Sequence, residues 1–307
     1  MPRPSQPDPR LPFIVTRTQA VDAGMTVDQI RQRVRSGKWT RLAHGAYRRN
    51  GAVADDSGDC FAAERRAHAE LAAAQAHASA GCVIAGFSAA AVHDIPVISA
   101  LPDYVSLVRP GSAGELRAGA RIRGWRVAPE DIQQTSPPVT GLARTWLDVA
   151  REGTLADALS AGDHLLRGLY ASLEELTAVV GRSDTSRGRR RIHLALAHVS
   201  RMRESPLESA SWAYFLERRI ALPQMQVVVR TAGGRFIGRV DFLWPEHRLV
   251  GECDGRAKYA HPDDLYAEKR REDALRAEGL RVTRWGLSDL RTDALAAHLR
   301  RTLAQVS

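Results

Sequence analysis

Lysine, cysteine and aromatic residues are scarce in this chain: of 307 residues, three are lysines, three are cysteines and 6% are aromatic. The cysteines Cys60, Cys82 and Cys253 are widely spaced and form no CxxC pair, which indicates neither a disulfide framework nor a zinc site and fits a reducing cytoplasm. The first residues lack the apolar core of a signal peptide, and the uncharged stretch 71–92 is too rich in alanine and polar residues for a membrane span. We therefore expect a cytoplasmic protein with no membrane partner.

Because lysine is so rare, nearly all of the positive charge is arginine, and the formal net charge is +9. Guanidinium groups pair bidentately with phosphates and guanine edges, so an arginine excess favours nucleic acid as a partner. The alternative is that the arginines reflect the base composition of the genome. Aromatic residues are few, and no run of alternating aromatic and basic residues suggests a platform on which unpaired bases could stack. An enzyme that acts on RNA is therefore the last of the hypotheses.

The segment after Pro12 predicts two short helices followed by a β hairpin. Thr16 begins a helix that ends at Gly24, and Thr26 with Gln29 forms the capping box of a second helix that ends at Gly37. The hairpin follows around His44. This is the order of a winged helix, whose second helix enters the major groove of DNA. The basic residues expected to face DNA are Arg31, Arg35, Lys38 and Arg41.

The alternative for these residues is an amphipathic helix whose charged side is merely solvated. The stretch from Thr16 to Arg49 resembles, however, the N-terminal domain of the AbiEi family of antitoxins from type IV toxin/antitoxin systems. That resemblance implies DNA binding and a possible cognate toxin. Arg144, Thr145, Leu147 and Asp148 resemble a segment that follows the winged helix in the same family.

Residues 51–203 predict a mixed, mostly helical middle region. Helical patterns cover 58–75, 87–95 and 139–169, and strand-like runs lie at 103–110 and 120–127. No catalytic constellation is recognisable there, and His93 next to Asp94 is interpreted as structural. The arginines between Gly181 and Arg203 suggest a linker with a basic patch, either solvated or in contact with phosphate.

The last part of the chain, residues 204–307, predicts a compact α/β unit. A helix at 205–219 is followed by two strands joined across Gly233 and Gly234, a third strand at 248–255, a charged helix, a fourth strand ending at Trp285 and a last helix. Asp241 lies in the second strand, and Glu252 and Asp254 close the third. Side chains alternate across a strand, so Glu252 and Asp254 share a face, and Asp241 joins them if the two strands are neighbours.

Three carboxylates at one place would suit Mg²⁺ or Mn²⁺ and the hydrolysis of a phosphodiester. The segments 204–219 and 227–259 resemble the Vsr-like branch of the PD-(D/E)XK nucleases, which belong to the restriction-endonuclease superfamily. The resemblance implies that Asp241 and Glu252 are metal-binding catalytic carboxylates and that Glu208 matches an acidic residue often found on the preceding helix. Arg270 and Arg271, on the flanking helix, are expected to serve DNA phosphate.

The chain departs from that family's pattern at the position two residues after Glu252, where Asp254 replaces the signature lysine. Lys258 or His261 is expected to supply the missing group, with Lys258 orienting the attacking water or stabilising the phosphate. Two structural alternatives stay open: Glu208 completes a capping box with Ser205, and Asp254 before Gly255 is a turn residue.

The sequence as a whole predicts a multi-domain α/β (α+β) protein. It comprises an N-terminal winged helix at 1–50, the middle region at 51–203 and a restriction-endonuclease-like α/β domain at 204–307. The first functional hypothesis is a DNA-binding protein that cleaves DNA with Mg²⁺ in a defence or toxin/antitoxin setting. The second is a non-catalytic antitoxin or transcriptional regulator that uses a degenerate nuclease fold to bind DNA or a partner.

Overall fold

The computed structural model describes residues 14–43, 45–49, 62–117, 119–184, 186–254 and 262–305. The chain forms two compact units. The first comprises Met1–Ile95, Ala100–Val149 and Ala178–Ser186, and the second comprises Pro96–Ser99, Ala150–Thr177 and Arg187–Ser307. The expected class, a multi-domain α+β protein, is confirmed, whereas the expected domain boundaries remain a prediction. Within the described residues, no helix has the length and apolar character needed to cross a membrane.

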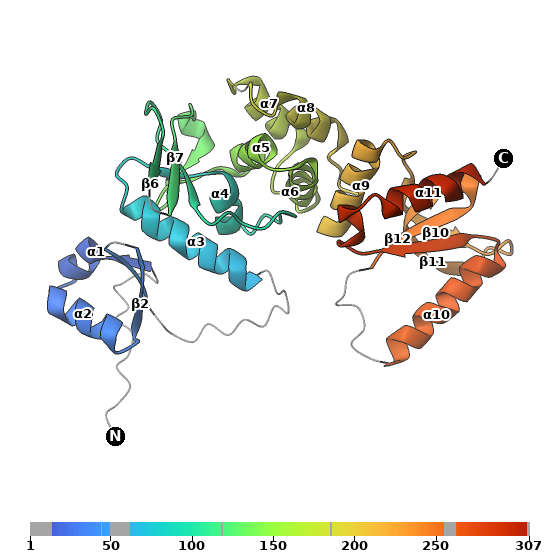
Figure 1. Ribbon diagram of the computed structural model, residues 1–307, viewed down its shortest axis with the longest axis horizontal. Coiled ribbons are helices and arrows are strands. Elements are labelled where there is room, and N and C mark those ends of the chain that lie inside the picture. The colour runs from blue at the N-terminus through green and yellow to red at the C-terminus, as the bar shows by residue number, and fades with distance from the viewer. Residues whose placement is uncertain are drawn as a thin grey trace. The chain divides into compact units, whose positions relative to one another are not determined.

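The first unit opens with the predicted helices and hairpin, preceded by one further strand (Figure 1). The elements are β1 (Ile14–Thr16), α1 (Arg17–Asp22), α2 (Val27–Arg35), β2 (Trp39–Ala43) and β3 (Ala46–Arg49), and the strands form a sheet in the order β1-β3-β2. Thr16 caps the first helix and Thr26 forms the predicted capping box with Gln29; Thr16 also forms a capping box with Gln19, which was not predicted. Local capping thus fixes where each helix starts.

A small core holds these helices against the hairpin. Met25 and Ile30 pack with Trp39, and Val34 and Tyr47 cover them. Two positive-φ glycines complete the turns, Gly37 after α2 and Gly45 between the hairpin strands, where an L side chain would be strained.

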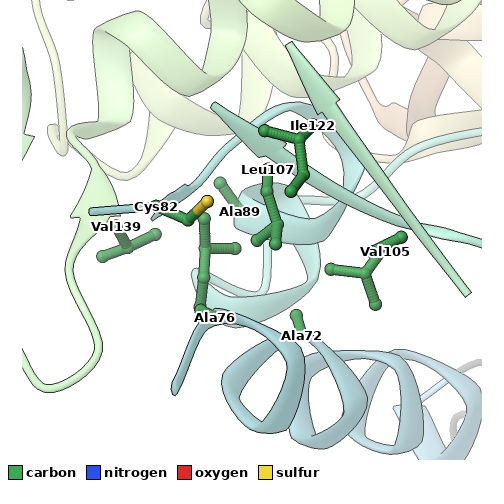
Figure 2. Packing of buried hydrophobic residues seen from close by; sticks show 10 residues of the cluster. Ala72, Ala76, Cys82, Ala89, Val105, Leu107, Ile122 and Val139 are labelled. Atoms are coloured by element: carbon green, nitrogen blue, oxygen red, sulfur yellow. The ribbon is translucent and has the colours of Figure 1, made fainter. Parts of the chain in front are cut away.

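The rest of the first unit is built around a six-stranded sheet in the order β6-β7-β5-β4-β9-β8. Its elements are α3 (Ala62–His77), β4 (Val83–Ile84), α4 (Gly86–Val92), β5 (Val105–Val108), β6 (Glu115–Arg117), β7 (Ala120–Arg123), η1 (Pro129–Asp131), β8 (Ile132–Gln133), β9 (Val139–Thr140) and α5 (Leu142–Glu152). Figure 2 shows α3 and α4 packing on one face of this sheet, where Ala72 and Ala76 meet Leu107 and Ile122. Alanine on the helix brings its backbone close to the sheet.

The strands of this sheet were only partly predicted. The runs at 103–110 and 120–127 contain β5 and β7, whereas β4, β8 and β9 are two residues long and carry no visible pattern. The predicted helices α3, α4, α5 and α6 (Leu155–Arg167) are all confirmed. His93 is structural, as expected: its Nε2 lies 2.7 Å from the carbonyl oxygen of Thr140.

The second unit contains a helical part followed by a four-stranded sheet. The helices are α6, α7 (Leu173–Gly181), which ends in the first unit, α8 (Arg189–His198) and α9 (Pro206–Arg218). The remaining elements are β10 (Gln224–Arg230), β11 (Phe236–Trp244), η2 (Pro245–His247), β12 (Leu249–Cys253), α10 (Pro262–Ala277), β13 (Arg281–Trp285), η3 (Asp289–Arg291) and α11 (Ala294–Ala304). Every element predicted for residues 204–307 is present in the expected order.

The sheet order is β10-β11-β12-β13, antiparallel except for the parallel pair β12 and β13, which α10 connects. A parallel pair requires such a crossover because the chain must return to the same end of the sheet. Phe215 of α9 packs edge-on against Phe242 and Trp285, which lie on the sheet strands. This aromatic cluster fixes α9 against the sheet.

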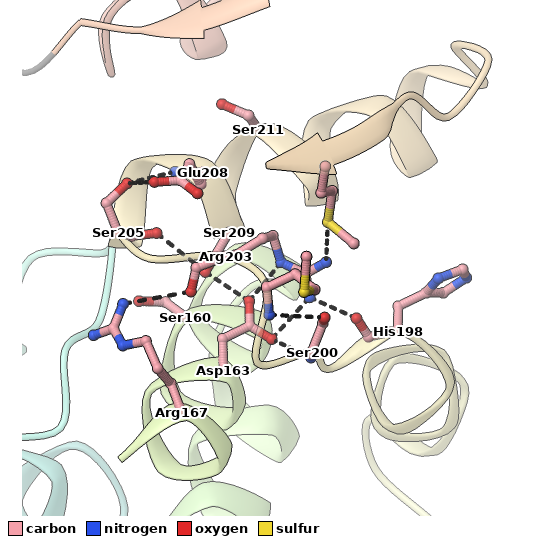
Figure 3. Close-up of polar contacts among 12 residues, drawn as sticks. Ser160, Asp163, Arg167, His198, Ser200, Arg203, Ser205, Glu208, Ser209 and Ser211 are labelled. Carbon is pink, nitrogen blue, oxygen red and sulfur yellow. Dashed lines mark hydrogen bonds and ion pairs between the residues drawn. The ribbon is translucent and has the colours of Figure 1, made fainter. Parts of the chain in front are cut away.

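The segment expected to be a basic linker is instead partly buried in the second unit (Figure 3). Arg203 is 1% exposed, and its guanidinium donates from Nε and Nη2 to the two carboxylate oxygens of Asp163 on α6, at 2.6 and 2.8 Å. Ser209 of α9 and the backbone N–H of Ser200 donate to the same carboxylate at 2.7 Å each. The expectation that these arginines are solvated or contact phosphate is therefore wrong for Arg203, because sequence reports its charge but not its buried partner, and the linker itself stays a prediction.

Candidate functional site

A basic groove lies between the second helix and the hairpin of the N-terminal sheet. Its volume is about 290 Å³, and its polar lining is dominated by arginine. The lining residues are Arg17, Val27, Ile30, Arg31, Val34, Arg35, Arg41, Gly45 and Tyr47. The groove therefore combines an apolar floor from α2 with cationic walls.

The local structure explains why these cationic side chains converge. Arg31 and Arg35 are one helical turn apart on α2, so they project from one side of it. Arg41 on β2 lies opposite Tyr47 on β3 in the antiparallel register, which places both on the same face of the hairpin. Arg17 reaches the groove because its backbone N–H donates to the carbonyl oxygen of Gly45 at 2.7 Å.

Of the four residues predicted to face DNA here, the structure brings Arg31, Arg35 and Arg41 together. Lys38 is exposed in the turn before β2 and does not line the groove. Arg31 also pairs with Asp28 at 2.9 Å, with side chains 66% and 87% exposed, and such a surface pair contributes little because water screens it. A phosphate oxygen can therefore replace Asp28 at small cost.

Sequence reasoning missed Arg17 and Tyr47. Arg17 is at the first position of α1, and its approach to the groove depends on a contact with Gly45, 28 positions later in the numbering. Tyr47 could have been found from strand alternation if the register of the hairpin had been known. Neither residue carries a local signal of its own.

The predicted acidic cluster lies on the sheet of the second unit. The register of β11 and β12 ends at the pair of Phe242 and Gly251, so Asp241 and Glu252 follow it on neighbouring strands. Val240 and Leu243 pack in one cluster with Leu275 of α10 although they are three positions apart, so regular alternation does not hold through Asp241, and a shared face for the two carboxylates stays a prediction. One carboxylate oxygen of Asp241 accepts a hydrogen bond from the backbone N–H of Cys253 at 2.8 Å.

Glu252 is buried, with 6% exposure, and two arginines neutralise it. Nη2 of Arg271 donates to both carboxylate oxygens, at 2.7 and 2.8 Å, and Nε of Arg284 lies 3.3 Å from one of them. Gly238 leaves room for this arrangement, because a Cβ there would come within 3.0 Å of Cδ of Arg271. Arg271 was predicted to contact DNA phosphate but instead pairs with a carboxylate of the protein itself. Arg270, for which the same contact was predicted, is exposed.

Glu208 has a capping arrangement close to the structural alternative left open above. Its backbone N–H donates to the hydroxyl of Ser205 at 3.2 Å, and its carboxylate accepts from that hydroxyl at 2.7 Å and from the backbone N–H of Glu204 at 2.9 Å. Gln226 of β10 adds a fourth hydrogen bond at 2.8 Å. With 5% exposure, this carboxylate is already well solvated by the protein.

The described residues do not fit a divalent ion as they are arranged. Among them, no three His, Cys, Asp or Glu side chains converge closely enough to hold a metal. Glu252 is neutralised by guanidinium groups, and Mg²⁺ requires carboxylate oxygens that are not already occupied. Asp254 follows β12, its N–H donating to the carbonyl oxygen of Trp285 at 2.9 Å. Lys258 and His261 lie outside the described residues.

Comparison with protein families supports the N-terminal interpretation. Residues 9–50 match the model of the AbiEi_4 family, described as "Transcriptional regulator, AbiEi antitoxin". The resemblance expected for the winged-helix segment is therefore confirmed: this segment is similar to an antitoxin family of transcriptional regulators. The match ends before the six-stranded sheet and the second unit.

Two curated relatives come from strains of Mycobacterium tuberculosis, and they are named Uncharacterized protein MT2308 and Uncharacterized protein Rv2248. Each is 30% identical over 169 residues, which cover 53% of this chain and 61% of the relative. The chain thus matches less than two thirds of the length of these relatives. A crystal structure of the RV2827C protein of the same species covers 70% of this chain and 79% of its own, with 20% identity and a TM-score of 0.36.

Proposed function

We propose that this protein is a transcriptional regulator of the antitoxin type that binds duplex DNA through the groove between α2 and the hairpin. The observation that carries the proposal is the convergence of Arg17, Arg31, Arg35 and Arg41 on that groove. The match of residues 9–50 to an antitoxin family of transcriptional regulators supports it independently.

In this function α2 enters the major groove while the hairpin contacts the phosphate backbone. Arg31 and Arg35 lie on the helix and are placed to read base edges or phosphates, and Arg41 on β2 is placed to hold the backbone. Arginine suits both tasks because its planar guanidinium donates two parallel hydrogen bonds. Ile30 of α2 packs in the core, whereas Arg31 and Arg35 are exposed and are left for DNA.

The test is binding of the full chain to duplex DNA taken from upstream of its own gene, measured by fluorescence anisotropy over a range of salt concentrations. The double variant Arg31→Ala/Arg35→Ala removes two cationic contacts, so the slope of log affinity against log salt should fall by about 1.8. Arg66→Ala, which removes an exposed arginine from α3, is the matched control. An unchanged affinity and slope in the double variant would refute the proposal.

A protein toxin is the second partner in this proposal. The family description supports it, since it includes the word antitoxin. Co-expression of the chain with a neighbouring nucleotidyltransferase-like gene product, followed by size-exclusion chromatography, tests it. A stable complex is the expected result, and two separately eluting proteins would limit the proposal to DNA binding.

A second candidate function is metal-dependent cleavage of DNA by the second unit. The observation that favours it is the approach of Asp241 to the end of β12 that carries Glu252, where its carboxylate accepts from the backbone N–H of Cys253 at 2.8 Å. The arginines around Glu252 count against it, because they occupy the oxygens that a metal would need. These arginines instead support a non-catalytic unit that binds a partner.

Calorimetry with Mn²⁺ on the full chain distinguishes the two candidates. A nuclease requires tight binding that is lost in Asp241→Asn and Glu252→Gln, together with DNA nicking that both changes abolish. A non-catalytic unit shows neither, and we expect Arg271→Ala to bind the ion better than the unaltered chain does. Nicking that survives both acid substitutions would identify a contaminating enzyme.

A further inference from the structure

The six-stranded sheet carries a second cationic surface, on the face opposite α3. Ala120 and Ile122 of β7 are buried in the core shared with α3, so the alternating residues Arg121 and Arg123 project from the other face. Leu116 of the edge strand β6 is the register partner of Arg121 and lies on the same side. Leu116 is 77% exposed, which shows that this edge of the sheet is open to solvent.

Two aromatic rings accompany these two arginines. The guanidinium carbon of Arg121 lies 5.7 Å from the ring centre of Tyr104, and that of Arg123 lies 4.9 Å from the ring centre of Trp125. Nη1 of Arg121 also donates to the hydroxyl of Tyr104 at 3.4 Å. The two arginines of β7, with Tyr104 before β5 and Trp125 after β7, form a platform that the composition of the chain did not reveal.

The electrostatic environment of this platform favours an anion. Burial tends to raise the pKa of Tyr104, but hydrogen bonds to Arg121 and Arg123 and their charges outweigh it and leave the pKa below its ordinary value. Glu115 and Arg117 are the register partners of Ile122 and Ala120, so they project from the opposite face, where Glu115 pairs with Arg117 and Arg109 at 2.5 and 3.9 Å. The charges of the platform itself are therefore those of Arg121 and Arg123.

A hollow beside the platform provides room for a flat group. Its volume is about 560 Å³, and it is lined by Tyr104, Gly114, Glu115, Leu116, Arg121 and Ile122. The lining is mostly apolar, with one ring, one cation and the carboxylate of Glu115, and its apolar part suits the face of a nucleobase.

We propose that this face of the sheet, formed by Tyr104, Leu116, Arg121, Arg123 and Trp125, binds single-stranded nucleic acid. The arginines and rings lie on strands and loops of the sheet and not on a helix, whereas duplex readers commonly place a helix in the major groove. Unpaired bases, in contrast, expose faces that stack on tyrosine and on guanidinium planes while the arginines hold the phosphates. An acidic peptide would use the charges but would leave the rings and the apolar hollow without a role.

The experiment measures anisotropy of labelled oligo(dT) and oligo(U) with the full chain across a salt series. The double variant Arg121→Gln/Arg123→Gln should lower the slope of log affinity against log salt by about 1.4, since single strands give about 0.7 per contact. Tyr104→Ala should weaken binding by about five- to a hundredfold through loss of stacking, while Tyr104→Phe, which keeps the ring, should bind nearly as the unaltered chain does. A preference for oligo(U) over oligo(dT) would identify RNA as the natural class.

Two controls separate this surface from the groove of the winged helix. Arg31→Ala/Arg35→Ala should leave single-strand binding unchanged, so this proposal survives even if the regulator proposed above fails. Circular dichroism of each variant verifies that the sheet is intact. Absence of single-strand binding at low salt overturns the proposal, as does full competition by an unrelated duplex, or an affinity that is the same in the Arg121/Arg123 double variant.

Discussion

The arginines of the N-terminal groove and the arginines that pair with Asp163 and Glu252 have different environments, although they look alike in the sequence. Those of the N-terminal groove lie on a surface, where Arg31 pairs with a carboxylate that is itself 87% exposed. In the second unit, Arg203 and Arg271 meet carboxylates that are 2% and 8% exposed. The comparison teaches that net charge alone does not identify a binding surface, because a buried carboxylate converts an arginine into part of the core.

The largest effect expected from this comparison is on folding. Arg203→Leu leaves the carboxylate of Asp163 buried beside Ser200 and Ser209 without its cation, which should lower the free energy of unfolding by about 3–5 kcal/mol. Arg35→Leu, on an exposed helix surface, should change it by less than about 0.5 kcal/mol. Urea denaturation followed by circular dichroism measures both.

The double variant Asp163→Leu/Arg203→Leu is the control for that loss. Because it removes the buried charge together with its partner, it should recover part of the stability that Arg203→Leu alone loses. Equal losses for Arg203→Leu and Arg35→Leu would contradict the distinction between the two environments.

A smaller loss is expected at the acidic cluster. Glu252→Ala removes the acceptor of Arg271 and Arg284 and should cost about 1–3 kcal/mol of unfolding free energy, because two partly buried guanidinium groups lose a partner. Glu252→Gln keeps one acceptor oxygen and should cost less. Thermal unfolding ranks the two variants, and stability unchanged in both would show that the cluster does not hold α10 to the sheet.

Substitutions in the N-terminal groove should weaken the binding of duplex DNA and leave the free energy of unfolding unchanged. Arg17→Ala removes a lining residue that only the structure identified, so the slope of duplex affinity against salt should fall by about 1. The unfolding midpoint should stay the same, because Arg17 is exposed. Salt-dependent anisotropy next to a denaturation curve tests both parts, and a shift in the midpoint alone would assign Arg17 to folding.

The smallest effect concerns pH. Burial lowers the pKa of His68 below its ordinary value of 6.5, and its Nε2 lies 2.8 Å from the hydroxyl of Ser88. The folded protein therefore disfavours protonation of His68. The contribution of neutral His68 to the free energy of unfolding is complete above the pKa that the side chain has in the unfolded chain, and it is lost as the pH falls through the lower pKa of the folded state. His68→Gln should reduce the loss of unfolding free energy between about pH 7 and about pH 5, whereas His298→Gln, at an exposed site, should not.

Much of the fold was predictable because its signals are local. The N-caps Thr16 and Thr26 located α1 and α2, and the order of elements after Ser205 was correct throughout. The strands β4 and β9 were not visible, since each has only two residues and depends on its neighbours for pairing. Local capping and periodicity therefore locate helices and long strands better than short strands in a mixed sheet.

The sequence predicted which types of residue form the candidate sites, but it did not predict which side chains pair with one another. Arg31, Arg35 and Arg41, predicted to face DNA, line one groove, whereas their contact with DNA and the shared face of Asp241 and Glu252 stay predictions. The pairing of Glu252 with Arg271 spans 19 positions and that of Asp163 with Arg203 spans 40, so no local pattern shows them. The platform of Tyr104 and Trp125 escaped notice for the same reason.

Helix α3 packs against two sheets, the three-stranded N-terminal sheet and the six-stranded sheet. It contacts the three strands of the N-terminal sheet as well as β4 and β5, and Arg48 of β3 pairs at 3.0 Å with Glu70, whose side chain is 8% exposed. The segment that matches the antitoxin family ends at residue 50, before this helix begins. A fragment that ends at residue 50 would expose the strand surface that α3 covers. A fusion that transfers the matched segment to another protein must therefore include α3.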